Sequence, residues 1–139
     1  MRRGFSLVEL LVVVGIIAVI LTIALPRYRA ARAFARETTA AEAMATLEAA
    51  QIQYRDAHGH YAASLHELGP GAAGLIGSAL AKGTDGDYNF RLTADGDRFV
   101  FTAAPVSGSG RSFFIDQTLT LRMSEGSAPA TEKSPEFHQ

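Results

Sequence analysis

Residues 4–26 read GFSLVELLVVVGIIAVILTIALP, and this stretch decides how the chain is organised. The 21 residues from Phe5 to Leu25 are apolar apart from four interruptions, Ser6, Glu9, Gly15 and Thr22. About 20 apolar residues are enough for a helix to cross the core of a bilayer. A carboxylate in that core costs about 3 kcal/mol on insertion scales, so an acid there is expected to have a function and a partner. The sequence therefore predicts a membrane-spanning helix in which Glu9 is functional.

These residues resemble the class III signal of type IV pilins and type II secretion pseudopilins. The shared features are a short basic leader that ends in Gly4, then Phe5, then Glu9, then the apolar helix with Pro26 at the family's distance from the cleavage point. The resemblance extends loosely to about Tyr61. It implies that residues 1–4 are a leader, that the prepilin peptidase cuts between Gly4 and Phe5, and that the new Phe5 amine is methylated. It also assigns Phe5, Glu9 and Pro26 to assembly.

The resemblance implies a structural function for the chain, as a pilin subunit of a type IV pilus or pilus-like filament. The expected partners are other copies of the chain in a helical homopolymer, the prepilin peptidase, minor pilins and the assembly platform in the inner membrane. In the polymer, the Phe5 amine of an adjacent subunit would neutralise Glu9, so Glu9→Val should insert in the membrane but assemble poorly. A type II secretion pseudopilin or a minor pilin is the alternative within the family.

The apolar segment would also fit a cleaved secretory signal, a plain membrane anchor or the tether of a membrane-tethered binding domain. A secretory signal has an apolar stretch of about 7 to 15 residues and a small-residue cleavage site. Ala31-Arg32-Ala33 offers such a site only after Pro26 and two arginines. A plain anchor explains the length of the segment but gives Glu9 no role.

Arginines on the C-terminal side of the apolar segment conflict with the expected orientation. The positive-inside rule would place this flank in the cytoplasm, whereas the resemblance implies a cytoplasmic N-terminus. We follow the resemblance because the leader motif is more specific than a charge bias. We therefore expect a single-pass protein of the bacterial inner membrane, which reaches an extracellular pilus or periplasmic pseudopilus after assembly. The arginines are Arg27, Arg29, Arg32 and Arg36.

The composition of the chain argues against several classes of function. The chain of 139 residues supports one small domain besides the apolar segment. Removing Arg2 and Arg3 from the 13 basic residues leaves 11 against 14 acidic ones, a formal charge of −3, so nucleic-acid binding is not predicted. Because the chain has no cysteine, it has neither a disulfide framework nor a thiol nucleophile. We expect no cofactor and no enzymatic activity, since no catalytic constellation is evident.

The sequence predicts an α+β, type IV pilin-like fold in five segments. Residues 1–4 form the leader, 5–26 the transmembrane and filament-core helix, and 27–58 the amphipathic half of the same helix, with a kink at Pro26. Residues 59–123 form a globular head with a connecting loop and a β-meander, and 124–139 a flexible tail. Gly59 is expected to end the helix. The helix stripe expected to face the sheet comprises Ala40, Ala43, Leu47, Ala50, Tyr54 and Ala57.

Four aromatic or β-branched runs predict an antiparallel meander of three or four strands that packs on this stripe. A tight turn is expected at Asp95-Gly96, and a short helix at 64–68. The predicted strands are 88–93, 98–103, 111–116 and 118–123.

Two side-chain groups have more than one interpretation. Asp85, Asp87 or Asp116 could supply oxygen ligands to calcium, but turn chemistry also explains these residues, and none lies in a full EF-hand ligand series. Arg29, Arg32 and Arg36 fall on one helical face and could pair with glutamates of neighbouring subunits. Alternatively, these side chains could be solvated and face membrane headgroups, where exposed pairs contribute only about 0 to 1 kcal/mol. The glutamates concerned are Glu37, Glu42 and Glu48.

Overall fold

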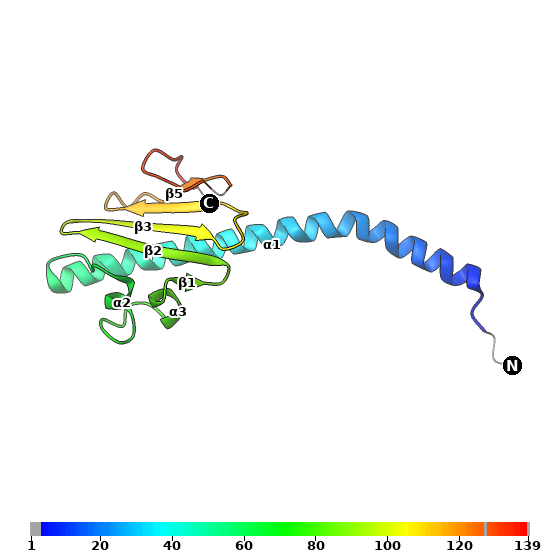
Figure 1. Ribbon diagram of the computed structural model, residues 1–139, viewed down its shortest axis with the longest axis horizontal. Coiled ribbons are helices and arrows are strands. Elements are labelled where there is room, and N and C mark those ends of the chain that lie inside the picture. Colours follow the sequence, from blue (N-terminus) through cyan, green and yellow to red (C-terminus); the bar gives the residue numbers. More distant parts are fainter. Residues whose placement is uncertain (1–3, 127, 139) are drawn as a thin grey trace. The chain divides into compact units, whose positions relative to one another are not determined.

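The computed structural model describes residues 4–126 and 128–138, and it consists of a long helix followed by an antiparallel sheet (Figure 1). The predicted α+β class is therefore confirmed. The chain divides into two compact units, the stem (Met1–Ala35) and the head (Arg36–Gln139), which we describe separately. The helices are α1 (Leu7–His58), α2 (Leu65–Leu68) and α3 (Ser78–Ala81). The strands are β1 (Thr84–Asp85), β2 (Tyr88–Asp95), β3 (Arg98–Pro105), β4 (Ser112–Asp116) and β5 (Arg122–Ser124).

Helix α1 continues through Pro26 and ends where the sequence predicts. Gly59 adopts a φ of +79°, and its N–H donates to the Arg55 carbonyl at 2.7 Å. A left-handed glycine directly after the last helical residue allows the chain to leave the helix while its final carbonyls stay bonded.

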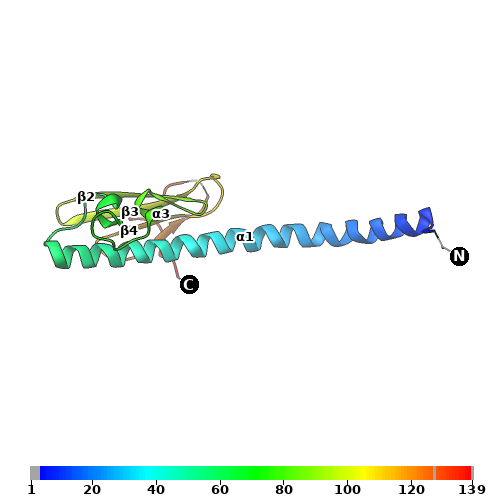
Figure 2. The same cartoon turned by 90° about the horizontal axis from the view of Figure 1, so that it is seen from below.

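The head core forms between the C-terminal part of α1 and the inner face of the sheet, which lie alongside each other in Figure 2. Ala40, Ala43, Leu47 and Ala50 of the predicted stripe are buried there. The prediction for Ala57 was wrong: it is exposed, because the last turn of α1 carries no residue of the core. The sheet contributes Phe90, Phe99, Phe101, Phe113 and Ile115, which alternate along their strands as predicted.

The sheet has five strands in the order β1-β2-β3-β4-β5, and every neighbouring pair is antiparallel. The expectation of three or four strands was therefore wrong, because the edge strands β1 and β5 are only two and three residues long and are defined by pairing rather than by composition. The predicted β2–β3 hairpin is confirmed, but its two turn residues are Gly96 and Asp97 rather than Asp95 and Gly96. Asp95 pairs with Arg98, and Gly96 has the positive φ, +59°, that a two-residue hairpin turn requires.

The predicted strand 118–123 begins only at Arg122. A turn occupies its first half, where the Leu119 N–H donates to the Asp116 carbonyl at 2.9 Å and Leu119 has a φ of +59°. Asp116 also accepts a hydrogen bond from the Thr118 N–H at 2.9 Å, so a local Asx turn competes with strand extension here.

The described part of the C-terminal segment contacts the sheet. The Phe137 N–H donates to Leu121 O at 2.8 Å, and the Met123 N–H donates to Pro135 O at 2.9 Å. The Phe137 ring packs edge-on against Phe113, with centroids 5.5 Å apart. Two backbone hydrogen bonds and an aromatic contact therefore attach the described part of a segment for which flexibility was predicted.

Candidate functional site

The bond expected to be cleaved lies outside the helix. Gly4, Phe5 and Ser6 precede α1 in non-helical conformation, and the first helical hydrogen bond joins Leu10 N–H to Ser6 O at 3.1 Å. Phe5 is 76% exposed. A peptide bond outside a helix has no helical hydrogen bonds to break before a protease can bind it in extended form. The geometry therefore suits cleavage between Gly4 and Phe5.

Glu9 lies in the first turn of α1, and its side chain is exposed without a hydrogen bond or ion pair to any described residue. Ser6 and Glu9 have the S-x-x-E spacing of a capping box, a local signal that the sequence-based predictions did not include. A carboxylate in the first turn gains about 0.3 to 1 kcal/mol from the helix dipole. That gain is smaller than the cost of about 3 kcal/mol for a carboxylate in a bilayer core, so the local geometry alone does not explain Glu9 there.

Thr22 provides a useful contrast within the same apolar segment. Its hydroxyl donates to the Val19 carbonyl at 2.6 Å, so this polar group is satisfied inside its own helix. The Glu9 carboxylate forms no such hydrogen bond with any described residue.

The stem exposes apolar side chains on all sides of the helix. This segment of α1 is long and apolar enough to cross a membrane. Monomeric soluble proteins rarely expose apolar patches larger than a few hundred Å². The stem surface is therefore suited to lipid or to other apolar helices. Its exposed large side chains are Leu7, Val8, Leu10, Leu11, Val12, Val13, Val14, Ile16, Ile17, Val19, Ile20, Leu21, Ile23 and Leu25.

Pro26 lies beside a shallow cleft of about 530 Å³ on the stem. Apolar groups of Leu21, Leu25 and Pro26 line most of it, together with Thr22 and Arg29. The cleft is a concave place on an otherwise convex helix surface, so it can receive an apolar side chain from another helix.

Charged residues at the start of the head pair within the chain. Arg36 Nε lies 2.7 Å from Asp87 Oδ2, and Arg111 Nη1 lies 3.7 Å from Glu37 Oε2. Glu37 also accepts a hydrogen bond from the Arg111 backbone N–H at 3.3 Å. Arg36 and Glu37, which were both considered for pairing between subunits, therefore form ion pairs within the head.

Tyr88 completes this group, since its hydroxyl donates to the Arg111 carbonyl at 2.9 Å. Burial, with the nearby Glu37 carboxylate as a second cause, raises the pKa of Tyr88 to about 12. The tyrosine therefore remains a hydrogen-bond donor across the physiological pH range and attaches the β3–β4 loop to the rest of the head.

The aspartates considered for calcium do not come together. Asp85 pairs with Tyr88 on β2, and Tyr88 lies opposite Pro105 on β3. Asp116 pairs with Val100, which is five residues away from Pro105 along β3. Asp87 pairs with Arg36. Within residues 4–126 and 128–138, no group of three or more potential metal ligands is present.

Comparison with known proteins identifies the N-terminal segment. Residues 1–25 match the family model described as the prokaryotic N-terminal methylation motif. No curated protein and no solved structure matches the chain. The motif and the exposed apolar helix fit a membrane-anchored pilin or pseudopilin. In its first 25 residues, the chain carries the class III signal peptide of type IV pilins and pseudopilins.

Proposed function

We propose that this chain is a structural subunit of a type IV pilus or a related filament such as a pseudopilus. It is processed between Gly4 and Phe5 by a prepilin peptidase, held in the inner membrane by residues 5–25, and polymerised through α1. The observation that carries the proposal is the Glu9 carboxylate, which has no partner among the described residues and lies on an exposed apolar segment that bears the methylation motif.

The proposed role of Glu9 follows from its surroundings in a stack of stems. Exposed apolar side chains of neighbouring stems would surround it, so its carboxylate would lose most of its contact with water. Cleavage creates an amine at Phe5, and methylation leaves that amine basic. The amine of an adjacent subunit is then a suitable cation for Glu9. Removing one member of a buried ion pair costs about 3 to 5 kcal/mol because the other member stays buried and unpaired.

Pro26 has a separate proposed role in the same stack. The cleft beside it would receive an apolar side chain of a neighbouring stem, which would determine how far one stem is displaced along the next. Partners of the assembled filament would be minor pilins and the inner-membrane assembly platform, which supplies the work of extraction.

The test compares Glu9→Val with Asp56→Val, an exposed acid of the head part of α1 that is not among the glutamates considered for intersubunit pairing. Each variant is expressed in the native bacterium, and the protein is measured in membranes and in sheared filaments. We expect both variants in the membrane at wild-type levels. Filament yield should fall at least about a hundredfold for Glu9→Val, from the loss of about 3 kcal/mol or more per contact, and should stay near wild type for Asp56→Val.

Mass spectrometry of the wild-type N-terminus supplies the second part of the test. The proposal requires a mature chain that begins with methylated Phe5. A mature protein that retains residues 1–4, or wild-type filament yield from Glu9→Val, would contradict it.

A further inference from the structure

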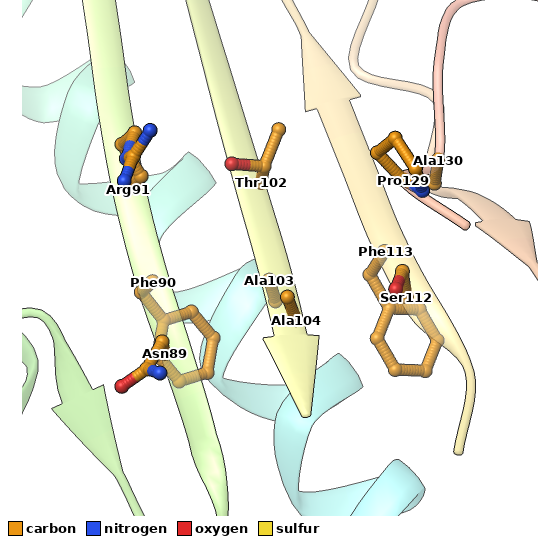
Figure 3. Close-up of a pocket in the computed structure, with 10 residues that line it drawn as sticks. All are labelled: Asn89, Phe90, Arg91, Thr102, Ala103, Ala104, Ser112, Phe113, Pro129 and Ala130. Carbon is orange, nitrogen blue, oxygen red and sulfur yellow. The ribbon is translucent and has the colours of Figure 1, made fainter. Parts of the chain in front are cut away.

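A pocket of about 410 Å³ lies on the outer face of the sheet, the face opposite α1 (Figure 3). It crosses β2, β3 and β4, and the Pro129–Ala130 segment lies beside β4 as its wall. Its polar side chains are Asn89, Arg91, Thr102 and Ser112. No acidic residue is among the described residues that line it, so Arg91 gives the pocket a net positive charge.

Strand register places these side chains together. Arg91 pairs with Thr102, and Asn89 pairs with Ala104, so the two pairs lie two residues apart along the β2–β3 ladder, with the Phe90–Ala103 pair between them. Residues two apart on a strand share a face, which puts all four on the side away from the core. The side chains of Asn89, Arg91 and Thr102 make no hydrogen bond or ion pair with another described residue, so their donors are available to a ligand.

Ser112 shows that the pocket is more than a hydrated strand surface. Only 2% of this residue is exposed, and its hydroxyl has no hydrogen-bond partner within the described parts of the chain. A buried hydroxyl without a partner destabilises the folded state. Figure 3 shows Ser112 on β4, next to Ala104 and close to the Pro129–Ala130 wall. This hydroxyl is therefore a candidate hydrogen-bonding group for a ligand in the pocket.

We propose that this pocket binds a small hydroxylated carboxylate of the size of a sugar acid. A guanidinium group pairs with a carboxylate through two parallel hydrogen bonds. The amide of Asn89 and the hydroxyls of Thr102 and Ser112 can each donate to and accept from ligand hydroxyls. Ala104, Pro129 and Ala130 supply an apolar surface for the C–H groups of a sugar ring. The volume lies within the range of about 300 to 1,000 Å³ that is typical of small-molecule sites.

The binding test uses the full chain, labelled with ¹⁵N in detergent micelles, and two probes that differ in one group, glucuronate and glucose. We expect saturable amide shifts at β2, β3 and β4 with glucuronate in the millimolar range, and none with glucose. Arg91→Gln should weaken glucuronate binding about tenfold or more, the effect of a lost charged hydrogen bond. Arg98→Gln, at an exposed arginine of β3 outside the pocket, is the matched control and should bind like wild type.

Ser112→Ala tests the unpaired hydroxyl. The variant should melt at the same temperature as the wild type or higher, because it removes an unsatisfied group, and it should bind glucuronate about two- to tenfold more weakly. The proposal is overturned if glucuronate causes no saturable shift up to about 10 mM. It is equally overturned if glucose acts like glucuronate, if Arg91→Gln binds normally, or if Ser112→Ala is less stable than the wild type.

Discussion

Gln51→Met should destabilise the head although the two side chains are similar in size. Gln51 is completely buried, and its amide forms two hydrogen bonds with one residue of the following loop. Its Nε2 donates to Ala62 O at 3.0 Å, while Ala62 N–H donates to its Oε1 at 2.8 Å. Methionine has nearly the same shape but can make neither bond, so both backbone groups of the buried Ala62 lose their partner.

The expected loss follows from these two bonds. A buried donor or acceptor left without a partner costs about 1 to 3 kcal/mol, so two of them cost about 2 to 6 kcal/mol. Burying the methionine side chain returns about 1 to 2 kcal/mol. The net decrease in the free energy of unfolding is therefore about 0 to 5 kcal/mol, with a midpoint of about 2.5 kcal/mol. For a unit of roughly 100 residues, a decrease at this midpoint lowers the melting temperature by about 10 °C or more.

The assay is thermal unfolding of the full chain in detergent, followed by near-ultraviolet circular dichroism. The buried rings of Tyr61 and Tyr88 make this signal a report on the head rather than on the stem helix. Gln53→Met is the matched control, because Gln53 is exposed on the same helix, and it should change the melting temperature little. Equal melting temperatures for the two variants would refute the reasoning.

Three further predictions concern the β3–β4 loop, its tyrosine and the C-terminal segment. Gly110→Ala should cost about 1 to 3 kcal/mol of head stability, because Gly110 has a φ of +125° and an added Cβ would lie 3.2 Å from the Tyr88 hydroxyl. Gly77→Ala, where an added Cβ meets open space, is the control. Equal urea midpoints for the two variants would contradict this prediction. Since the pKa of Tyr88 is raised from 10.0 to about 12, the folded head keeps a proton that the unfolded chain loses in this range. Unfolding free energy should therefore fall as pH rises from 10 to 12, and Tyr88→Phe should reduce that slope in urea titrations; an unchanged slope would count against it. Phe137→Ala removes the edge-on contact with Phe113, so limited proteolysis should cut residues 125–136 faster than in wild type, and equal cleavage rates would argue against this anchor.

Local signals made the helix and the central hairpin predictable. Helix α1 depends on the composition of its own residues, and Gly59 ends it through a backbone conformation that glycine adopts readily. Asp95-Gly96 likewise determines the hairpin within four residues. The role proposed for Glu9 also rests on a local observation, one acid in an apolar run. The capping-box spacing of Ser6 and Glu9 is equally local and could have been predicted from the sequence.

Features that depend on distant residues could not be predicted. Glu37 and Arg111 are 74 residues apart in the chain, and nothing near either residue indicates the other. The burial of Gln51 was not predictable either, because its partner Ala62 comes close only when the loop after α1 folds back. The pocket around Ser112 depends on strand register and on the C-terminal segment, so no sequence pattern indicated it.

The most direct test of the central claim is the structure of the assembled filament at a resolution that shows side chains. The proposal predicts that the methylated amine of Phe5 in one subunit lies within about 4 Å of the Glu9 carboxylate of its neighbour. A filament in which Glu9 contacts water, or pairs only with the amine of its own chain, would contradict the proposal.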